Sequence, residues 1–400
     1  MIRQVISIGM AFVGIIIGAG FASVQETMQY FVAFGSWGLA GAVVSSIVMI
    51  IAGVSLMQLG SYYQAREHLS VLSSISGRTV SLILDISTTI TLFAVGFIMF
   101  AGAGANLNQQ FGLSTWIGGG LMLVLVLVAG LLDVDRVTYV IGAMTPFIFI
   151  FIVIACGYAI ITASADIASL NVASQEVSTT LPNWWISALN YTGFNVIVAA
   201  SMAIVIGGTF LDSKVAGWGG LLGGLIYLIL LLLLAVGLFF EVELVNGDDM
   251  PALTLINEIN PVLGWLMAVA IYGMIFNTAI SMFYALGKRL TKRSPKRFYP
   301  TFAAACVIGF VLSFIGFQKL IGFVYPLLGY LGLFLILVVT VAWLRGRSKM
   351  TVEQRIRVQA LDLMRRKQNP SLRFSAAQQR ELERLIAAST VSEETLRREL

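Results

Sequence analysis

The sequence predicts an all-α membrane protein with ten transmembrane helices. Of its 400 residues, 58% are apolar and only 11% are charged, and the mean hydropathy is +0.90. Ordinary soluble domains carry about 25% charged residues, and one soluble core of this size cannot bury so much apolar surface. The apolar runs are continuous rather than alternating, which excludes a β-barrel.

Ten apolar runs are long enough to cross a bilayer, which takes about 20 residues. They lie at about 5–33, 37–60, 79–108, 114–132, 137–163, 185–208, 218–241, 263–287, 299–316 and 320–344. An even number of spans places both termini on one side of the membrane. If that side is the cytosol, the outer loops contain a single basic residue, Lys319. The basic residues on the cytosolic side are Arg3, Arg66, Arg78, Arg136, Lys214, Lys288, Arg289, Lys292, Arg293, Lys296 and Arg297. The positive-inside rule therefore predicts a multi-pass cell-membrane protein with cytosolic termini.

The spans divide into two halves around the loop near 164–184. Five spans precede this loop and five follow it, and an odd number in each half gives the halves opposite orientations, as an inverted repeat requires. We expect a ten-helix domain at 1–344, with repeats at about 5–163 and 185–344.

Residues 345–400 hold 13 of the 25 Lys and Arg residues and are expected to form a basic cytosolic tail. Apolar stripes predict helices near 352–367 and 376–388, which dock on the membrane domain, self-associate or bind a cytosolic partner. Nucleic acid is not expected as a partner, because the basic charge directly follows a membrane span.

The residues of acid–base and metal chemistry are scarce. His68 is the only histidine, and Cys156 and Cys306 each lie within an apolar run. This composition argues against zinc, haem and histidine-based catalysis, so neither an enzyme nor a bound cofactor is expected.

The first span contains Gly14, Gly18 and Gly20. Gly14 and Gly18 are four residues apart, which suits a helix-packing seam. Gly20 lies on a different face, which favours an unwound stretch whose free backbone groups pair with a ligand or an ion.

The sixth span contains a dense polar group, with Asn190, Tyr191, Thr192 and Asn195 around Gly193. Competing side-chain hydrogen bonds predict a second break here, and interrupted helices at matching places in two halves indicate a transporter binding site. The alternative is that the glycines only let helices touch and that the polar group bonds across helices.

These two segments carry a family resemblance. The run GIIIGAGF at 14–21 resembles the broken first helix of the amino acid–polyamine–organocation superfamily, and GFN at 193–195 resembles its broken sixth helix. The longer run GIIIGAGFASVQE most resembles the YkvI-like family of amino acid permeases. The resemblance covers about 5–344 and implies a LeuT-type fold with broken helices 1 and 6. It also implies alternating-access transport of a small amino acid or related zwitterion.

The resemblance also implies which residues bind the substrate and the ion. The backbone of Gly18, Ala19 and Gly20 would hold the substrate carboxylate, and Phe194, with Tyr191 and Asn195, would line its side-chain pocket. Sodium-coupled members would use the carbonyls at Gly14 and Ile17 together with polar groups of the eighth span, here Asn277, Thr278 and Ser281.

Sodium is thus the first coupling ion expected. The eighth span departs from the family pattern, because Asn277 replaces one of two hydroxyl residues and, in a second register, Met282 follows Ser281. The alternative is that these side chains cap local backbone groups in a kinked helix.

Two acidic residues, Glu26 and Asp85, lie within predicted spans. A charge at the bilayer centre costs at least about 2.5–3.5 kcal/mol, so each needs a reason. We expect Glu26 to act as a gate residue or proton carrier, which makes proton coupling the alternative to sodium. Asp85 is expected at the cytosolic interface, paired with a basic residue. A non-transporting sensor or scaffold that signals through the tail is a further alternative, although it has no use for polar groups at both helix breaks.

Overall fold

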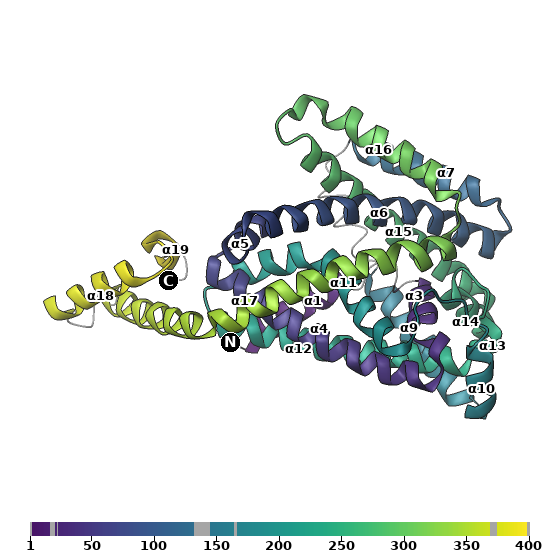
Figure 1. Cartoon of the computed structure of the whole chain (residues 1–400), viewed down its shortest axis with the longest axis horizontal. Helices are drawn as coiled ribbons and strands as arrows, with labels where there is room; N and C mark the ends of the chain where they lie inside the picture. Colours follow the sequence, from purple (N-terminus) through teal and green to yellow (C-terminus); the bar gives the residue numbers. More distant parts are fainter. Residues whose placement is uncertain are drawn as a thin grey trace.

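The computed structural model describes residues 2–16, 21, 23–131, 145–163, 166–368 and 374–397. This part of the chain is helical and contains no strand, so the predicted all-α class is confirmed. The long helices run beside one another along the longest axis of the molecule (Figure 1). The N-terminus and the tail lie at one end of this bundle, and α10, α13 and α14 lie at the other.

In chain order, the helices of the first half are α1 (Ile2–Ile16), α3 (Gln25–Tyr30), η1 (Val32–Phe34), α4 (Ser36–Tyr63), α5 (His68–Ile75), α6 (Arg78–Phe111), α7 (Thr115–Ala129), α9 (Thr145–Thr162) and α10 (Ile167–Ser174). Those that follow are α11 (Trp184–Gly208), α12 (Ser213–Phe240), α13 (Val242–Val245), α14 (Pro251–Ile259), α15 (Pro261–Leu290), η2 (Pro295–Arg297), α16 (Phe298–Ser313), α17 (Phe317–Gln368), α18 (Ala376–Ala388) and α19 (Glu393–Arg397).

Six of the described helices are long and apolar enough to cross a bilayer, namely α4, α6, α11, α12, α15 and α17. The helices α1, α7 and α9 are shorter and apolar. Large apolar side chains such as Leu82, Ile229 and Leu337 are exposed on the outside, which suits contact with lipid rather than water. The chain is therefore a multi-pass membrane protein, while the number ten and the division into two inverted halves stay predictions.

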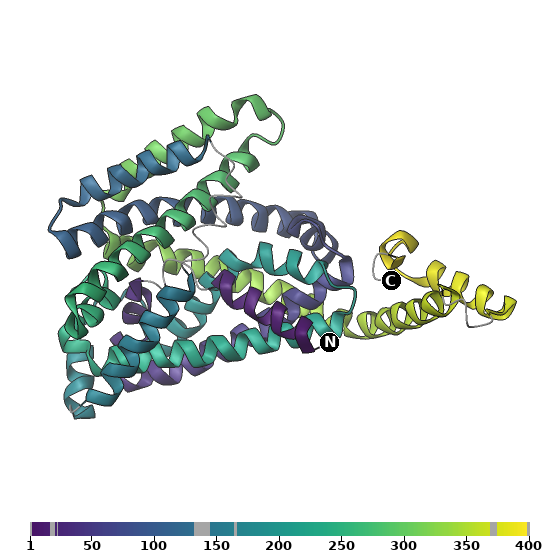
Figure 2. The ribbon, with the colours of Figure 1, turned by 180° about the vertical axis from the view of Figure 1, so that it is seen from behind.

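The helices pack in two groups. One contains α1, α4, α11 and α12, and the other contains α6, α7, α15 and α16. Helix α17 contacts both groups, mainly through α11 but also through α4 and α6. Figure 2 shows the same arrangement from behind, with α1 lying against the first group.

Glycines allow α11 and α17 to touch backbone to backbone. A Cβ atom on Gly193 would clash with the carbonyl oxygen of Gly329, and one on Gly332 would clash with the carbonyl oxygen of Gly193. Small residues permit such close approach between membrane helices. Gly193 is thus a packing residue at the point where the sixth span meets the last.

The predicted break in the sixth span is wrong, because α11 is one continuous helix. Its polar side chains bond across helices instead of unwinding their own. Asn190 donates to the carbonyl oxygen of Pro326 at 2.9 Å and accepts from the Tyr30 hydroxyl at 3.2 Å. The Thr192 hydroxyl lies 2.8 Å from that of Ser45. The alternative interpretation of this polar group is therefore confirmed.

The first span is interrupted before α3. Helix α3 begins at Gln25, and Val24 directly before it has a left-handed backbone with φ of 54°. A β-branched residue rarely adopts this left-handed conformation. A residue in this conformation cannot lie inside a continuous right-handed helix, so the helix is broken at Val24. The glycine-rich stretch Ile17–Gly20, where the break was predicted, lies outside the described residues.

Helix α17 has 52 residues and ends at Gln368, so the helix predicted near 352–367 is confirmed as the C-terminal part of α17. It is continuous with the helix predicted at about 320–344. The segment at 345–351, between the predicted span at 320–344 and the predicted helix at 352–367, is rich in Arg, Lys and Met, which propagate a helix well. Gly346 is its only glycine. The second tail helix is confirmed as α18. The domain boundary at 344 stays a prediction.

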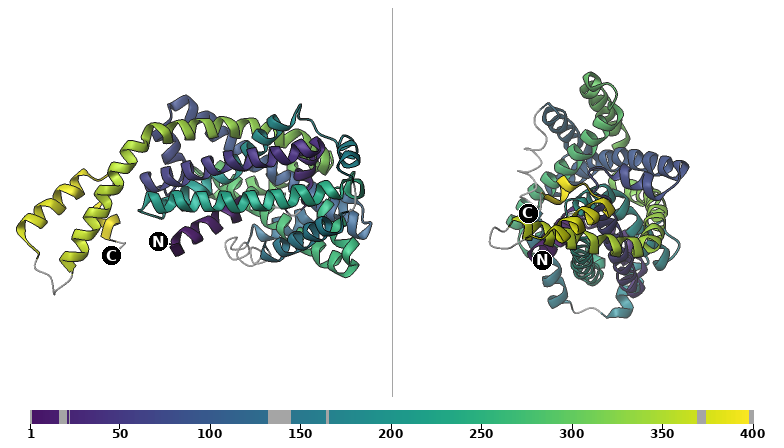
Figure 3. Two further views of the ribbon diagram at one scale, coloured as in Figure 1. Left: turned by 90° about the horizontal axis from the view of Figure 1, so that it is seen from below. Right: turned by 90° about the vertical axis from the view of Figure 1, so that its left-hand side faces the viewer.

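The tail docks on the end of the bundle that carries the N-terminus (Figure 3). Helices α18 and α19 pack on the extension of α17 through an apolar cluster of Leu211, Ala360, Met364, Leu382, Leu385, Val391 and Leu396. Arg357, 1% exposed, donates to the carbonyl oxygens of Ser61 and Tyr62 at the end of α4 and of Leu211 after α11.

Arg357 also pairs with Glu353 at 2.7 Å. Burial alone raises the pKa of Glu353, but hydrogen bonds from Arg357, Ser389 and Thr390 outweigh it and hold the pKa below its usual value of 4.5. The carboxylate is therefore part of the network that holds the tail in place.

Candidate functional site

A cavity of about 260 Å³ lies among α1, α3, α6, α11, α15 and α17. Its lining residues are Gly14, Ile15, Ile16, Phe21, Glu26, Val95, Met99, Phe194, Asn195, Val198, Met274, Asn277, Thr278, Ser281, Met282 and Tyr325. Val95, Phe194 and Asn277 lie close to the middle of α6, α11 and α15, which are all long enough to span a bilayer. The cavity is therefore at mid-membrane depth, where transporters bind their substrates.

One wall of the cavity is aromatic. The Phe194 ring stacks on Tyr325 with 3.9 Å between centroids and 20° between planes. The two rings come from α11 and α17, whose backbones touch at Gly193, next to Phe194. This close contact fixes the wall, which is suited to an apolar or aromatic part of a ligand.

Another part of the lining is a polar edge on α15. The Oδ1 atom of Asn277 is buried without a hydrogen-bond partner in the described part of the chain. The hydroxyls of Thr278 and Ser281 face the same cavity, and α15 is an uninterrupted helix around them. A buried acceptor without a partner is uncommon and needs an explanation, which a bound cation or a polar ligand group supplies.

The donor set at this edge fits a hard monovalent cation chemically. It consists of an amide oxygen and two hydroxyls, with the backbone of Gly14 on the same cavity. Ile17, the other predicted carbonyl ligand, lies outside the described residues. None of the three α15 side chains is seen to cap a backbone group within the described chain, so the alternative interpretation gains no support there.

Glu26 brings a carboxyl group to the cavity from α3. Its side chain is 3% exposed and lies within hydrogen-bond reach of the Tyr191 hydroxyl. Tyr191 itself is buried behind the cavity, where its ring packs against Tyr30 and Phe31. Glu26 is the only carboxylate among the described lining residues, which include no Lys, Arg or His.

The structure thus gathers most of the predicted site residues in one place. Those that line the cavity are Gly14, Glu26, Phe194, Asn195, Asn277, Thr278 and Ser281. Tyr191 is buried and does not line the cavity, although its hydroxyl lies within hydrogen-bond reach of Glu26. Gly18, Ala19 and Gly20, predicted to hold the substrate carboxylate, lie outside the described residues. The roles of all these residues stay predictions.

The sequence did not point to Phe21, Val95, Met99 or Tyr325, which also line the cavity. An apolar residue in an apolar span carries no signal of its own. Tyr325 is the exception, because Pro326 follows it, and a proline inside a membrane helix marks freed backbone groups.

Asp85 is paired as predicted. Its carboxylate meets the guanidinium of Arg289 from α15, which also donates to the Asp85 backbone oxygen at 2.9 Å. Neither residue lines the cavity. This ion pair ties α6 to α15 and has a structural role.

Comparison with known proteins finds two similar proteins of Bacillus subtilis. No family model matches the chain. The membrane protein YkvI of Bacillus subtilis is 27% identical over 324 residues, which cover 80% of this chain and 91% of YkvI. The protein YyaD of the same organism is 23% identical over 325 residues, which cover 81% of this chain and 92% of YyaD.

Solved structures share the fold at low identity. MhsT, in complex with L-phenylalanine, superposes with a TM-score of 0.58 at 11% identity over 94% of both chains. A manganese transporter from Eremococcus coleocola superposes with a TM-score of 0.50 at 13% identity over 99% of this chain and 95% of its own. The second of these structures is named as a transporter. The chain is therefore similar in sequence to YkvI and YyaD, and it has the LeuT-type fold that its glycine-rich first span predicts.

Proposed function

We propose that the protein is a secondary active transporter that moves a small amino acid or related zwitterion by alternating access. The central cavity is the observation that carries this proposal. It combines a stacked aromatic wall with a polar edge at mid-membrane depth, where the buried Oδ1 of Asn277 has no partner in the described part of the chain, and Glu26 supplies one carboxylate. Its volume of about 260 Å³ is below the range of roughly 300–1,000 Å³ that is typical of pockets for drug-sized ligands. A cavity of this size therefore suits a small substrate.

The charges of the lining favour a zwitterion. Glu26 and the backbone carbonyls offer acceptors for an ammonium group, while Asn195 and the α15 hydroxyls offer donors for a carboxylate. The predicted cradle at Gly18–Gly20 would add backbone N–H groups. A second carboxylate would find no basic side chain among the described lining residues, so an acidic substrate is disfavoured. A cationic substrate would use Glu26.

We propose sodium as the coupling ion. Asn277, Thr278 and Ser281 supply oxygen atoms on one face of α15, and the unpaired Oδ1 of Asn277 supports a cation there. Proton coupling through Glu26 is the second candidate, because this carboxyl group is buried and lines the cavity.

The proposed architecture has ten spans in two inverted halves, at about 5–163 and 185–344, in the cell membrane. Both termini and the tail at 345–400 would be cytosolic. The helices pack in two groups, and α17 contacts both of them. This packing supports alternating access, because one group can rock against the other.

The test is the thermal stability of the purified protein with a panel of amino acids, with and without sodium, at two pH values. A ligand that binds only the folded state stabilises it by about 2.7 kcal/mol at a hundredfold excess over its dissociation constant. We expect a sodium-dependent shift that Thr278→Ala abolishes. Thr301→Ala, the same change on α16 away from the cavity, should keep the shift.

Two other outcomes would redirect the proposal. A shift that depends on pH alone and is lost in Glu26→Gln would assign coupling to protons. No shift with any amino acid would contradict amino acid transport and favour the sensor or scaffold that signals through the tail.

A further inference from the structure

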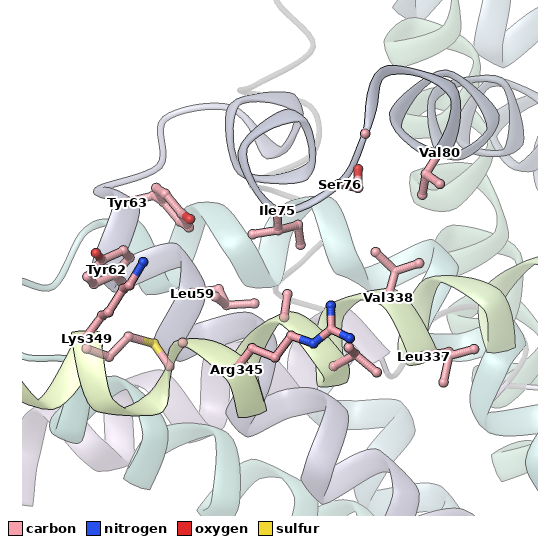
Figure 4. A pocket seen from close by; sticks show the side chains of 15 residues that line it. Leu59, Tyr62, Tyr63, Ile75, Ser76, Val80, Leu337, Val338, Arg345 and Lys349 are labelled. Carbon is pink, nitrogen blue, oxygen red and sulfur yellow. The ribbon is translucent and has the colours of Figure 1, made fainter.

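A second cavity, of about 500 Å³, lies at the end of the bundle that carries the tail. The end of α4, the turn between α5 and α6, and the part of α17 around the predicted end of the last span enclose it (Figure 4). Its lining residues are Leu59, Tyr62, Tyr63, Ile75, Ser76, Gly77, Val80, Leu337, Val338, Val341, Ala342, Arg345, Gly346, Lys349 and Met350. It shares no residue with the central cavity.

The inner half of this second cavity is apolar and opens towards lipid. Leu337, Val338 and Val341 line it from α17, and Leu337 is 61% exposed. From Leu337 to Lys349 the helix rises about 18 Å, at 1.5 Å per residue. The cavity therefore runs from the hydrocarbon region to the membrane surface, where Tyr63, 39% exposed, lies at its mouth.

The outer half carries positive charge without a matching acid. Arg345 and Lys349 are one helical turn apart on the same face of α17, so they repel each other. No acidic side chain lines the cavity, and neither cation forms an ion pair within the described chain. Figure 4 shows the Arg345 guanidinium pointing towards the turn that holds Ser76, and the Lys349 amine lying near Tyr62.

The start of α6 adds backbone donors to the same space. Gly77 precedes this 34-residue helix and provides no side-chain cap, and the first N–H groups of a helix have no partner within the helix. Free N–H groups and the helix dipole favour an anion at this position. Two unpaired cations and one uncapped helix start thus face a single cavity whose other half is apolar.

We propose that this cavity binds one anionic phospholipid, with its phosphate at Arg345 and Lys349 and an acyl chain along Leu337, Val338 and Val341. Charge complementarity selects the headgroup, and the apolar inner half selects a lipid over a free anion. The site joins α4, α6 and α17, and so contacts both helix groups. It does not depend on the proposed transport function.

The experiment titrates detergent-purified full-length protein with phosphatidylglycerol, phosphatidylcholine or inorganic phosphate and follows thermal stability. Phosphatidylglycerol should stabilise the protein, whereas the other two should not. Each surface cation contributes about fivefold to anionic-lipid affinity, so R345Q/K349Q should shift the titration midpoint by about 30-fold. R355Q/R380Q removes two exposed tail charges outside the cavity and is the matched control.

A second variant tests the apolar half without touching charge. Ala342→Phe fills the cavity between the cations and the acyl-chain region, and should also weaken phosphatidylglycerol binding. Equal stabilisation by both lipids, equal stabilisation by inorganic phosphate, or equal loss in both double variants would overturn the proposal.

Discussion

Replacing Arg357 by Met should release the tail from the membrane domain. All five N–H groups of its guanidinium donate, to Glu353, Ser61, Leu211, Tyr62 and Thr390. Removing one partner of a buried ion pair costs about 3–5 kcal/mol, because it leaves the other charge unpaired. Adding up five separate charge-assisted bonds would overestimate the cost, since the carbonyl groups regain water once the tail opens.

Amide hydrogen exchange of α18 and α19 measures this release directly. A loss of 3–5 kcal/mol in local stability lowers protection by about two to more than three orders of magnitude. Arg355→Met is the control, because Arg355 is exposed on the same helix. Equal protection of α18 in the two variants would refute the assigned role of Arg357. Adding Glu353→Gln to Arg357→Met removes the unpaired carboxylate and should recover part of the lost protection.

Three further changes have defined outcomes. Gly193→Ala should lower thermal stability, because the new Cβ atom would clash with the α17 backbone. Gly157→Ala is the control, because the space around a Cβ atom there is open. It should leave the stability unchanged or raise it by up to about 1 kcal/mol. Asn277→Ala should keep the stability of the ligand-free protein and lose sodium-dependent stabilisation, because it removes a buried acceptor that has no partner; ligand stabilisation like that of wild type would contradict this. The pKa of Glu353 in the folded protein lies below its usual value. Protection of the tail amides against hydrogen exchange should therefore be full above pH 4.5 and fall as the pH drops through the folded pKa. In Glu353→Gln, the same measurement across pH should show no such transition.

The sequence predicted much of the cavity because polar residues are conspicuous in apolar spans. Glu26 was singled out by the cost of placing a charge in lipid. Asn277 and Phe194 followed from the resemblance of the first and sixth spans to a known superfamily. Tyr325 could not be assigned in the same way, because its stacking on Phe194 depends on how α17 packs against α11.

The error in the sixth span has a physical cause. Asn190 and its neighbours were expected to unwind this span, but tertiary hydrogen bonds from α3 and α17 satisfy them within a regular helix. Partners distant in sequence outweigh the local preference there, and one sequence does not reveal such partners. The docking of the tail through Arg357 depends on partners of the same kind.

Uptake into proteoliposomes tests the central claim most directly. The amino acid that gives the largest thermal shift would be supplied in radiolabelled form, with an inward sodium gradient. We expect saturable uptake by the wild type and by Phe323→Trp, whose side chain is 78% exposed on α17. Phe194→Trp, which adds bulk to the central cavity, should remove uptake while the protein stays folded. Uptake by Phe194→Trp equal to that of the wild type would contradict the assignment of this cavity as the transport site.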